Sequence, residues 1–204
     1  CQILWFAGIH GALIVTGIMN PFWMANLSVN QAAIAAGTAI PHIYVQGFWD
    51  HYLLIGGVGS TLPLALLLIR SKAVHLRTIG RMGIVPGLFN INEPMIFGAP
   101  IVMNPILAVP FILAPMVNTV VVYLFTISGL IPRMMVKPPF TIPAPLGALI
   151  TTNWNLIACG LVFICFFISL AIYYPFFKVY EKKMLETQQA QQEEEEKAKQ
   201  LADA

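Results

Sequence analysis

Charged side chains are scarce in this 204-residue sequence. Asp, Glu, Lys and Arg make up 10% of it and apolar residues 58%, whereas an average soluble domain is about 25% charged. The shortage of charge excludes the ordinary water-soluble globular classes. It also argues against nucleic-acid binding, because the basic residues are scattered and no aromatic residues are interleaved with them. The composition is that of a membrane protein.

Cysteine is also rare, with three residues at Cys1, Cys159 and Cys165. The last two lie in an apolar run without a nearby histidine or carboxylate, so we interpret them as packing residues. The histidines form no i, i+4 pair with a carboxylate of the zincin type, and no serine lies in a nucleophile-elbow motif. The sequence therefore predicts no metal site and no cofactor.

The few charges divide the chain into two parts. Residues 1–177 carry six basic and two acidic side chains, whereas residues 178–204 carry five basic and seven acidic ones. This split predicts a membrane-embedded body over 1–177 and a charged cytoplasmic tail over 178–204, either a solvated helix or a disordered extension. The apolar sequence begins at once and without a methionine. We therefore expect the chain to be the carboxy-terminal part of a longer protein.

Apolar runs predict where the chain crosses the membrane. A helix needs about 20 apolar residues to span a hydrocarbon core about 30 Å thick, and residues 2–25, 106–130 and 155–174 qualify. Pro21 should bend or end the first of these helices. Residues 53–69 are apolar but contain three glycines and a proline, which favours a bent or re-entrant segment.

The fold class that these runs predict is an all-α polytopic membrane protein with broken helices and re-entrant hairpins. Six prolines interrupt residues 86–115, and non-helical backbone at membrane depth is tolerated only where protein buries it or where it lines a cavity. Four basic residues within 70–81 and three lysines within 178–183 indicate cytoplasmic segments by the positive-inside rule.

Glu93 is the strongest candidate for a functional residue. It is the single charged residue between Arg81 and Arg133, and an intramembrane carboxylate is costly enough to indicate function. Asn90 and Asn92 precede it and offer hydrogen-bond donors and acceptors. This polar cluster on a proline-broken backbone suits a ligand with several hydroxyl groups. The alternative is a glutamate that only binds freed backbone amides and holds the hairpin together.

Three further residues are candidate ligand contacts. His10 lies between two glycines that would let a ligand approach closely, although an intramembrane histidine can simply be a packing residue. Asp50 precedes the glycine cluster of residues 56–59, which either contacts an anion or sugar or forms a tight bend. Trp154 lies between two asparagines near the last span, where it either stacks on a sugar ring or anchors the helix at the interface.

The stretch GLFNINEPMIFGAPIVMNPILAVPFILAP at residues 87–115 closely resembles a known signature. It is similar to the membrane-spanning IIC component of the bacterial phosphoenolpyruvate-dependent sugar phosphotransferase system, in the lactose, cellobiose and diacetylchitobiose family. WFAGIHG at 5–11, FWDHYLLIGGVGSTL at 48–62 and YPFFKVYEK at 174–182 resemble the same family. Residues 139–143 and 152–155 depart from it, so the resemblance leaves the sugar open.

The resemblance implies a permease in the bacterial cell membrane that binds a β-linked disaccharide of the cellobiose, chitobiose or lactose type. It would carry the sugar across and present its 6-hydroxyl for phosphorylation by a phosphocysteine on a separate IIB protein, which works with IIA. This chain would not be catalytic alone. Glu93 and His10 map to the family's sugar site with Asn92 as a neighbour, and Glu93 could also accept the hydroxyl proton. Besides contacts with membrane lipid, we expect a homodimer formed through the amino-terminal half.

Two other interpretations stay open from the sequence. Glu93, Asp50 and His10 could form a proton relay in an ion-coupled secondary sugar transporter with a broken-helix site. The chain could also be an inert fragment that lacks its amino-terminal half.

Overall fold

The structure, a computed structural model, describes residues 1–99 and 101–202. Every regular element in these residues is helical, as the sequence predicts, and their order is as follows: α1 (Gln2–Phe6), α2 (Gly11–Ala35), α3 (Gln46–Phe48), the π-helical turn η1 (Trp49–Leu53), α4 (Leu62–Ile69), α5 (Val74–Leu88), α6 (Glu93–Gly98), α7 (Pro105–Ile127), α8 (Ala144–Thr151) and α9 (Leu156–Ala202).

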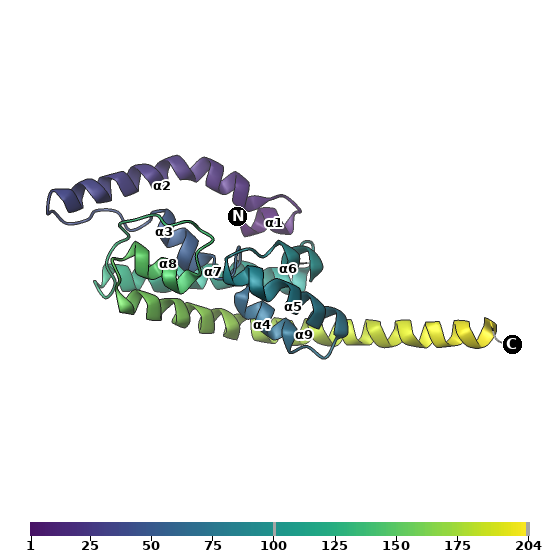
Figure 1. The fold of residues 1–204 in the computed structure, drawn as a ribbon. Helices are drawn as coiled ribbons and strands as arrows, with labels where there is room; N and C mark the ends of the chain where they lie inside the picture. The colour runs from purple at the N-terminus through teal and green to yellow at the C-terminus, as the bar shows by residue number, and fades with distance from the viewer. Residues whose placement is uncertain (100, 203–204) are drawn as a thin grey trace.

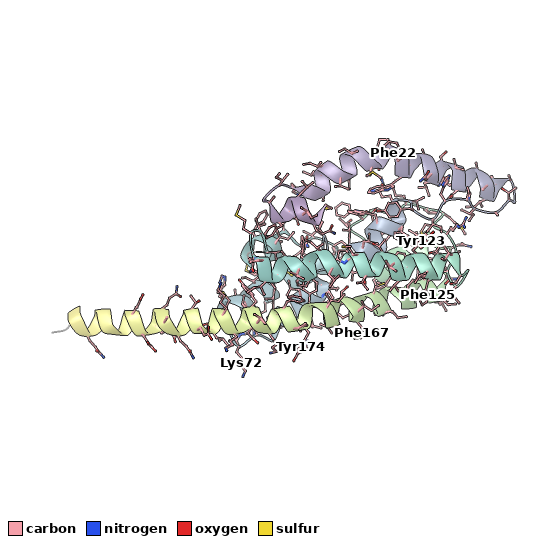
Figure 2. The ribbon with its side chains drawn as sticks, turned by 180° about the vertical axis from the view of Figure 1, so that it is seen from behind. Phe22, Lys72, Tyr123, Phe125, Phe167 and Tyr174 are labelled. Atoms are coloured by element: carbon pink, nitrogen blue, oxygen red, sulfur yellow. The ribbon has the colours of Figure 1, made fainter. Side chains whose placement is uncertain are left out.

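Three helices among the described residues are long and apolar enough to cross a membrane: α2, α7 and the first part of α9. α7 and α9 pack along each other, and the second half of α9 projects beyond the rest of the chain (Figure 1). Large apolar side chains point outward from these helices, among them Phe22, Tyr123 and Phe167 (Figure 2). An outward apolar surface of this kind suits lipid acyl chains.

The first predicted span is wrong in its limits. The chain does not form one helix over residues 2–25, because α1 ends at Phe6 and α2 begins at Gly11 and continues to Ala35. Gly8 breaks the helix with a φ of +80°, which costs glycine little. His10 then caps α2, since its Nδ1 accepts a hydrogen bond from Leu13 N–H at 3.3 Å. Pro21 lies inside α2 and does not end it.

The other two predicted spans correspond to α7 and to the first part of α9. Asparagine side chains begin both helices. Asn104 Oδ1 accepts from Ile106 N–H at 3.0 Å, and Asn155 Oδ1 accepts from Ala158 N–H at 3.0 Å. α9 continues past Lys178 to Ala202. The helical interpretation of the tail is therefore correct for its described residues.

Residues 53–69 form a broken segment, as predicted. Residues 54–61, here called the glycine loop, are all buried and precede the short helix α4. Gly56, Gly57 and Gly59 have φ values of +79°, +94° and +84°, so the loop turns sharply without a Cβ penalty. α4 packs against α5 and α9, which places the glycine loop in the interior.

Candidate functional site

Glu93 is the first residue of α6 and the centre of the candidate site. The backbone carbonyl of Asn92 accepts hydrogen bonds from Met95 N–H at 2.9 Å and from Ile96 N–H at 3.0 Å, which starts the helix. Pro94 occupies the first turn, where its missing N–H is not needed. The Glu93 side chain is partly exposed, and no hydrogen bond or salt bridge with another described residue engages its carboxylate. The carboxylate is thus available to a ligand.

Asn90 lies in the turn before α6 and is 6% exposed. Its Oδ1 accepts a hydrogen bond from Gly56 N–H at 3.2 Å. Its Nδ2 donates to the carbonyls of Phe140 at 2.6 Å and Ile142 at 3.2 Å. The side chain therefore contacts the glycine loop and the loop of residues 139–143 at once.

Asn92 is 3% exposed and faces the glycine loop. Its Nδ2 donates to Val58 O and to Thr61 Oγ1, both at 2.7 Å. A Cβ on Gly57 would lie 2.4 Å from Asn92 Cγ, so the amide fits only against a glycine. Asn90 and Asn92 precede Glu93 as the sequence shows, but their amides bind backbone groups and the Thr61 hydroxyl of neighbouring loops.

His10 is joined to α6 through Trp5. The ring centroids of His10 and Trp5 are 4.2 Å apart, and those of Trp5 and Phe97 are 6.1 Å apart. Phe97 is four residues after Glu93 in α6. Trp5 is 3% exposed, and its indole N–H has no hydrogen-bond partner among the described residues. A buried donor without a partner is costly. Trp23 N–H shares this feature, so Trp5 is a candidate ligand donor only because its ring also contacts His10. The sequence interpretation missed Trp5, although it stands in the quoted WFAGIHG stretch.

The arrangement around Glu93 suits a polyhydroxylated ligand. A carboxylate accepts hydrogen bonds, an indole N–H donates one, and aromatic rings stack on the apolar face of a sugar. The described residues also contain no group of three potential metal ligands.

The comparisons identify the family of the chain. A family model described as phosphotransferase system, EIIC, matches residues 1–115. The chain belongs to this family. It is therefore a multi-pass membrane component of a phosphotransferase system.

Individual relatives cover most of the chain. The oligo-beta-mannoside-specific EIIC component of Bacillus subtilis is 41% identical over 94% of this chain and 44% of its own length. The cellobiose-specific EIIC component of Geobacillus stearothermophilus is 41% identical over 93% of this chain and 43% of its length. The chain spans less than half of the length of these curated relatives.

A solved structure has the same fold as this EIIC chain. It is the crystal structure of the transporter ChbC, the IIC component from the N,N'-diacetylchitobiose-specific phosphotransferase system. The TM-score is 0.88 and the sequences are 35% identical, with 92% of this chain and 44% of ChbC covered. The match extends the family relationship over the helices that follow residue 115.

Among the described residues, no hydrogen bond, salt bridge or ring contact joins Asp50 or Trp154 to Glu93. Asp50 is buried in η1 and is 2% exposed, with Oδ2 lacking a hydrogen-bond partner there. Trp154 follows α8, is 64% exposed and donates its backbone N–H to Leu149 O at 2.7 Å. Their roles as sugar contacts stay predictions.

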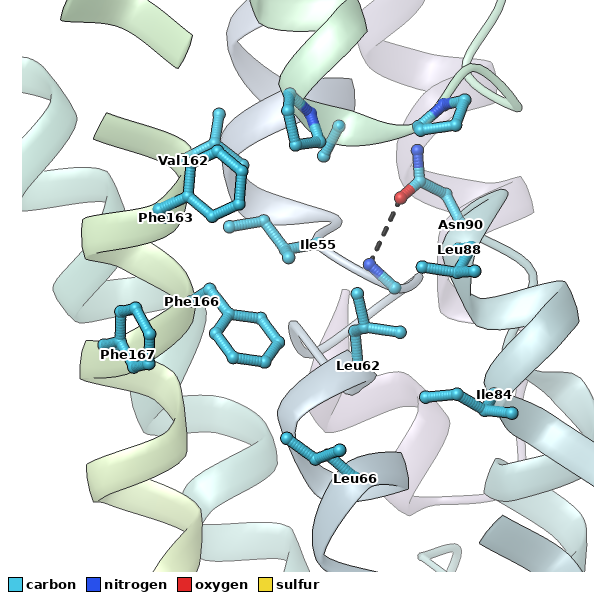
Figure 3. A pocket seen from close by; sticks show the side chains of 14 residues that line it. Ile55, Leu62, Leu66, Ile84, Leu88, Asn90, Val162, Phe163, Phe166 and Phe167 are labelled. Atoms are coloured by element: carbon cyan, nitrogen blue, oxygen red, sulfur yellow. Dashed lines mark hydrogen bonds between the residues drawn. The ribbon is translucent and has the colours of Figure 1, made fainter. Parts of the chain in front are cut away.

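A groove of about 460 Å³ lies between α4, α5, α8 and α9 (Figure 3). Its lining is almost wholly apolar, with Phe163, Phe166 and Leu62 among the larger side chains, and Asn90 stands at its edge. A sugar needs several polar partners, so this groove is a poor sugar site.

Cys159 and Cys165 lie on α9 and are free thiols.

Proposed function

We propose that this chain is the sugar-binding part of an EIIC permease for a β-linked disaccharide of the cellobiose, chitobiose or lactose type. The main supporting observation is the Glu93 carboxylate at the start of α6, which no described residue engages, on the short helix whose Phe97 contacts the Trp5–His10 aromatic pair. The substrates in the names of the relatives, oligo-beta-mannosides, cellobiose and diacetylchitobiose, support this class of sugar.

In the proposed mechanism, Glu93 accepts hydrogen bonds from sugar hydroxyls, and Trp5 and His10 add a donor and a stacking surface. A buried site that bonds a hydroxyl rejects analogues lacking it, because its polar groups would go unpaired. Placing the sugar 6-hydroxyl near Glu93 would let a phosphocysteine on IIB reach it. Phosphoryl transfer asks mainly for such positioning, and Glu93 could accept the hydroxyl proton. In this proposal the donor cysteine is on IIB, and Cys1, Cys159 and Cys165 would not take that role.

The proposal extends to the surroundings of the chain. Residues 1–177 would lie in the cell membrane in contact with lipid, and residues 178–204 would be the charged cytoplasmic tail. IIB, phosphorylated by IIA, would approach from the cytoplasmic side. Asp50 and Trp154 would contact the sugar in another conformation, and dimerisation would use a part of the permease outside this chain.

Uptake measurements test the proposal. We would build a chimaera in which this chain replaces the matching segment of the Geobacillus cellobiose-specific relative. Cells would receive radiolabelled cellobiose or diacetylchitobiose, with and without IIB. The expected product is sugar phosphate that requires IIB. Glu93→Gln should lower uptake about tenfold or more, whereas Glu186→Gln, on the exposed part of α9, should not change it.

Two results would overturn the proposal. Accumulation of free sugar that collapses with the proton gradient would instead indicate the proton-coupled transporter, with Glu93 in the relay. Full phosphorylation by the Glu93→Gln chimaera at all sugar concentrations would remove Glu93 from the site. A fall at low sugar that disappears at saturation would assign Glu93 to binding and exclude the proton-acceptor role.

A further inference from the structure

The glycine loop is non-helical backbone in the interior of a membrane protein, so its polar groups must find partners inside the chain. Side chains from distant elements supply them. Tyr173 O–H donates to Gly59 O at 2.7 Å, and Asn118 Nδ2 donates to Ser60 Oγ at 3.2 Å. Further bonds to the loop come from Asn90 and Asn92. The loop is thus attached directly to the turn that carries Glu93.

We infer that Asn90 is a positioning residue that couples the glycine loop and the loop of residues 139–143 to Glu93. Its three hydrogen bonds to Gly56, Phe140 and Ile142, here called the Asn90 bridge, join Asn90 to residues that lie 34 to 52 positions away in sequence. Figure 3 shows the bond to Gly56. The inference rests on the proposed function for its sugar readout.

The hydrogen-bonding capacity of Asn90 separates positioning from direct binding. An amide nitrogen has two protons, and in Asn90 both are given to carbonyls while Oδ1 accepts from a backbone amide. The side chain is 6% exposed. No amide proton is left for a sugar, and burial limits access to the remaining lone pair of Oδ1. The sequence prediction that Asn90 contacts the sugar directly stays untested, and the inference gives this residue an indirect role instead.

The backbone of Asn90 fits the same role. Its φ is +62°, a left-handed conformation that asparagine adopts more readily than most residues. This conformation turns the chain from α5 towards α6 and directs the amide at two loops.

Asn92 extends the coupling by one more contact. It stands at the N-cap of α6, but its side chain makes no capping hydrogen bond. Both protons of its Nδ2 go to the glycine loop instead, at Val58 O and Thr61 Oγ1. The residue immediately before Glu93 is therefore fixed by the glycine loop, so a displacement of that loop must displace the carboxylate.

A matched pair of substitutions tests the inference in the chimaera. Asn90→Asp keeps the acceptor for Gly56 N–H and removes both donors. Asn30→Asp is the control, because it removes two donated hydrogen bonds of the same kind. Asn30 Nδ2 donates to His42 O at 2.9 Å and to Met134 O at 3.1 Å, while its Oδ1 accepts from His42 N–H at 2.9 Å. Asn30 is fully buried on α2 and does not contact the turn before Glu93.

The readouts are disaccharide affinity and backbone amide exchange. Loss of two buried donors in Asn90→Asp should weaken affinity about tenfold and raise exchange in residues 54–61 and 139–143 together. Asn30→Asp should leave affinity within about twofold of the parent. Because Asn90 acts through Glu93, the double variant Asn90→Asp/Glu93→Gln should bind no more weakly than Glu93→Gln alone.

Three outcomes would overturn the inference. Additive losses in the double variant would make Asn90 a direct ligand. Equal losses of disaccharide affinity in Asn30→Asp and Asn90→Asp would show that the Asn90 bridge only stabilises the fold. Unchanged exchange in either loop would show that Asn90 does not couple them. If Glu93→Gln alone leaves affinity unchanged, the proposed function fails, and the exchange data still decide whether Asn90 couples the two loops.

Discussion

Glu181 accepts a hydrogen bond from the Ser71 hydroxyl at 2.8 Å, although 110 positions separate the two residues. The same carboxylate oxygen accepts from Lys72 N–H at 2.8 Å, and the other oxygen pairs with Lys178 Nζ at 2.9 Å. Glu181 is 5% exposed. This contact attaches α9, beyond its membrane-spanning part, to the turn between α4 and α5, and so to the end of the broken segment.

The Glu181 contact should make stability depend on pH. Burial raises the pKa of Glu181, but hydrogen bonds from Lys178, Lys72 and Ser71 and the Lys178 charge bring it below its ordinary value of 4.5. A carboxyl whose pKa is lowered by folding stabilises the protein above the unfolded pKa and loses that contribution as pH falls through the folded pKa. Thermal unfolding of the detergent-solubilised chain should show this loss below about pH 4.5.

Substitution separates this contribution from other carboxyl groups. Glu181→Gln should cost about 1–3 kcal/mol at neutral pH and flatten the acid transition. The control is Glu186→Gln, because Glu186 is exposed and lies 3.8 Å from Lys182; exposed pairs of this kind contribute about 0–1 kcal/mol. Identical pH profiles for the two variants would contradict the prediction.

Gly57→Ala should destabilise the chain through a contact as well as through backbone strain. Gly57 has a φ of +94°, and an added Cβ would meet Asn92. Gly129 has a φ of +78° with no atom within 4 Å of its Cβ position, so Gly129→Ala measures the strain alone, about 1–2 kcal/mol. In thermal unfolding, the free energy of unfolding of Gly57→Ala should be lower than that of Gly129→Ala by a further ~1–3 kcal/mol. Equal losses would mean that Asn92 moves aside freely.

Tyr173→Phe should destabilise more than Tyr174→Phe. Tyr173 is fully buried and donates its hydroxyl to Gly59 O at 2.7 Å, whereas Tyr174 is 52% exposed. Removing the donor leaves a buried carbonyl without this partner, which costs about 1–3 kcal/mol. Unfolding of the two neighbouring variants under the same conditions provides the comparison. If Tyr174→Phe loses as much stability as Tyr173→Phe, the hydrogen bond from the Tyr173 hydroxyl is not the cause of the destabilisation.

Trp5→Phe should weaken sugar binding without a large loss of stability. Phenylalanine keeps the ring beside His10 and Phe97 but removes the unpartnered indole N–H, so affinity of the chimaera should fall about tenfold. Trp23→Phe is the matched control, because Trp23 N–H is also buried without a partner but its ring packs against Trp49 and Tyr44. Equal affinity losses would remove Trp5 from the site.

Composition and local motifs determined much of this protein. The scarcity of charge predicted the membrane fold, the apolar runs located α7 and the membrane part of α9, and the glycines between 53 and 69 predicted a broken segment. The isolated carboxylate made Glu93 the leading candidate for the site, and this role stays a prediction. These features depend on residues near one another in sequence, where transfer free energies and backbone preferences act directly.

Tertiary structure decided how the polar residues are used. Asn90 and Asn92 look like ligand contacts in the sequence, yet their partners lie 31 to 52 positions away and consume their donors. The break between α1 and α2 brings Trp5 against His10, a contact that a continuous helix over residues 2–25 would not predict. Which hydrogen bonds a buried amide makes depends on the loops that the fold brings to it, because polar groups away from water bind whatever partners lie within reach.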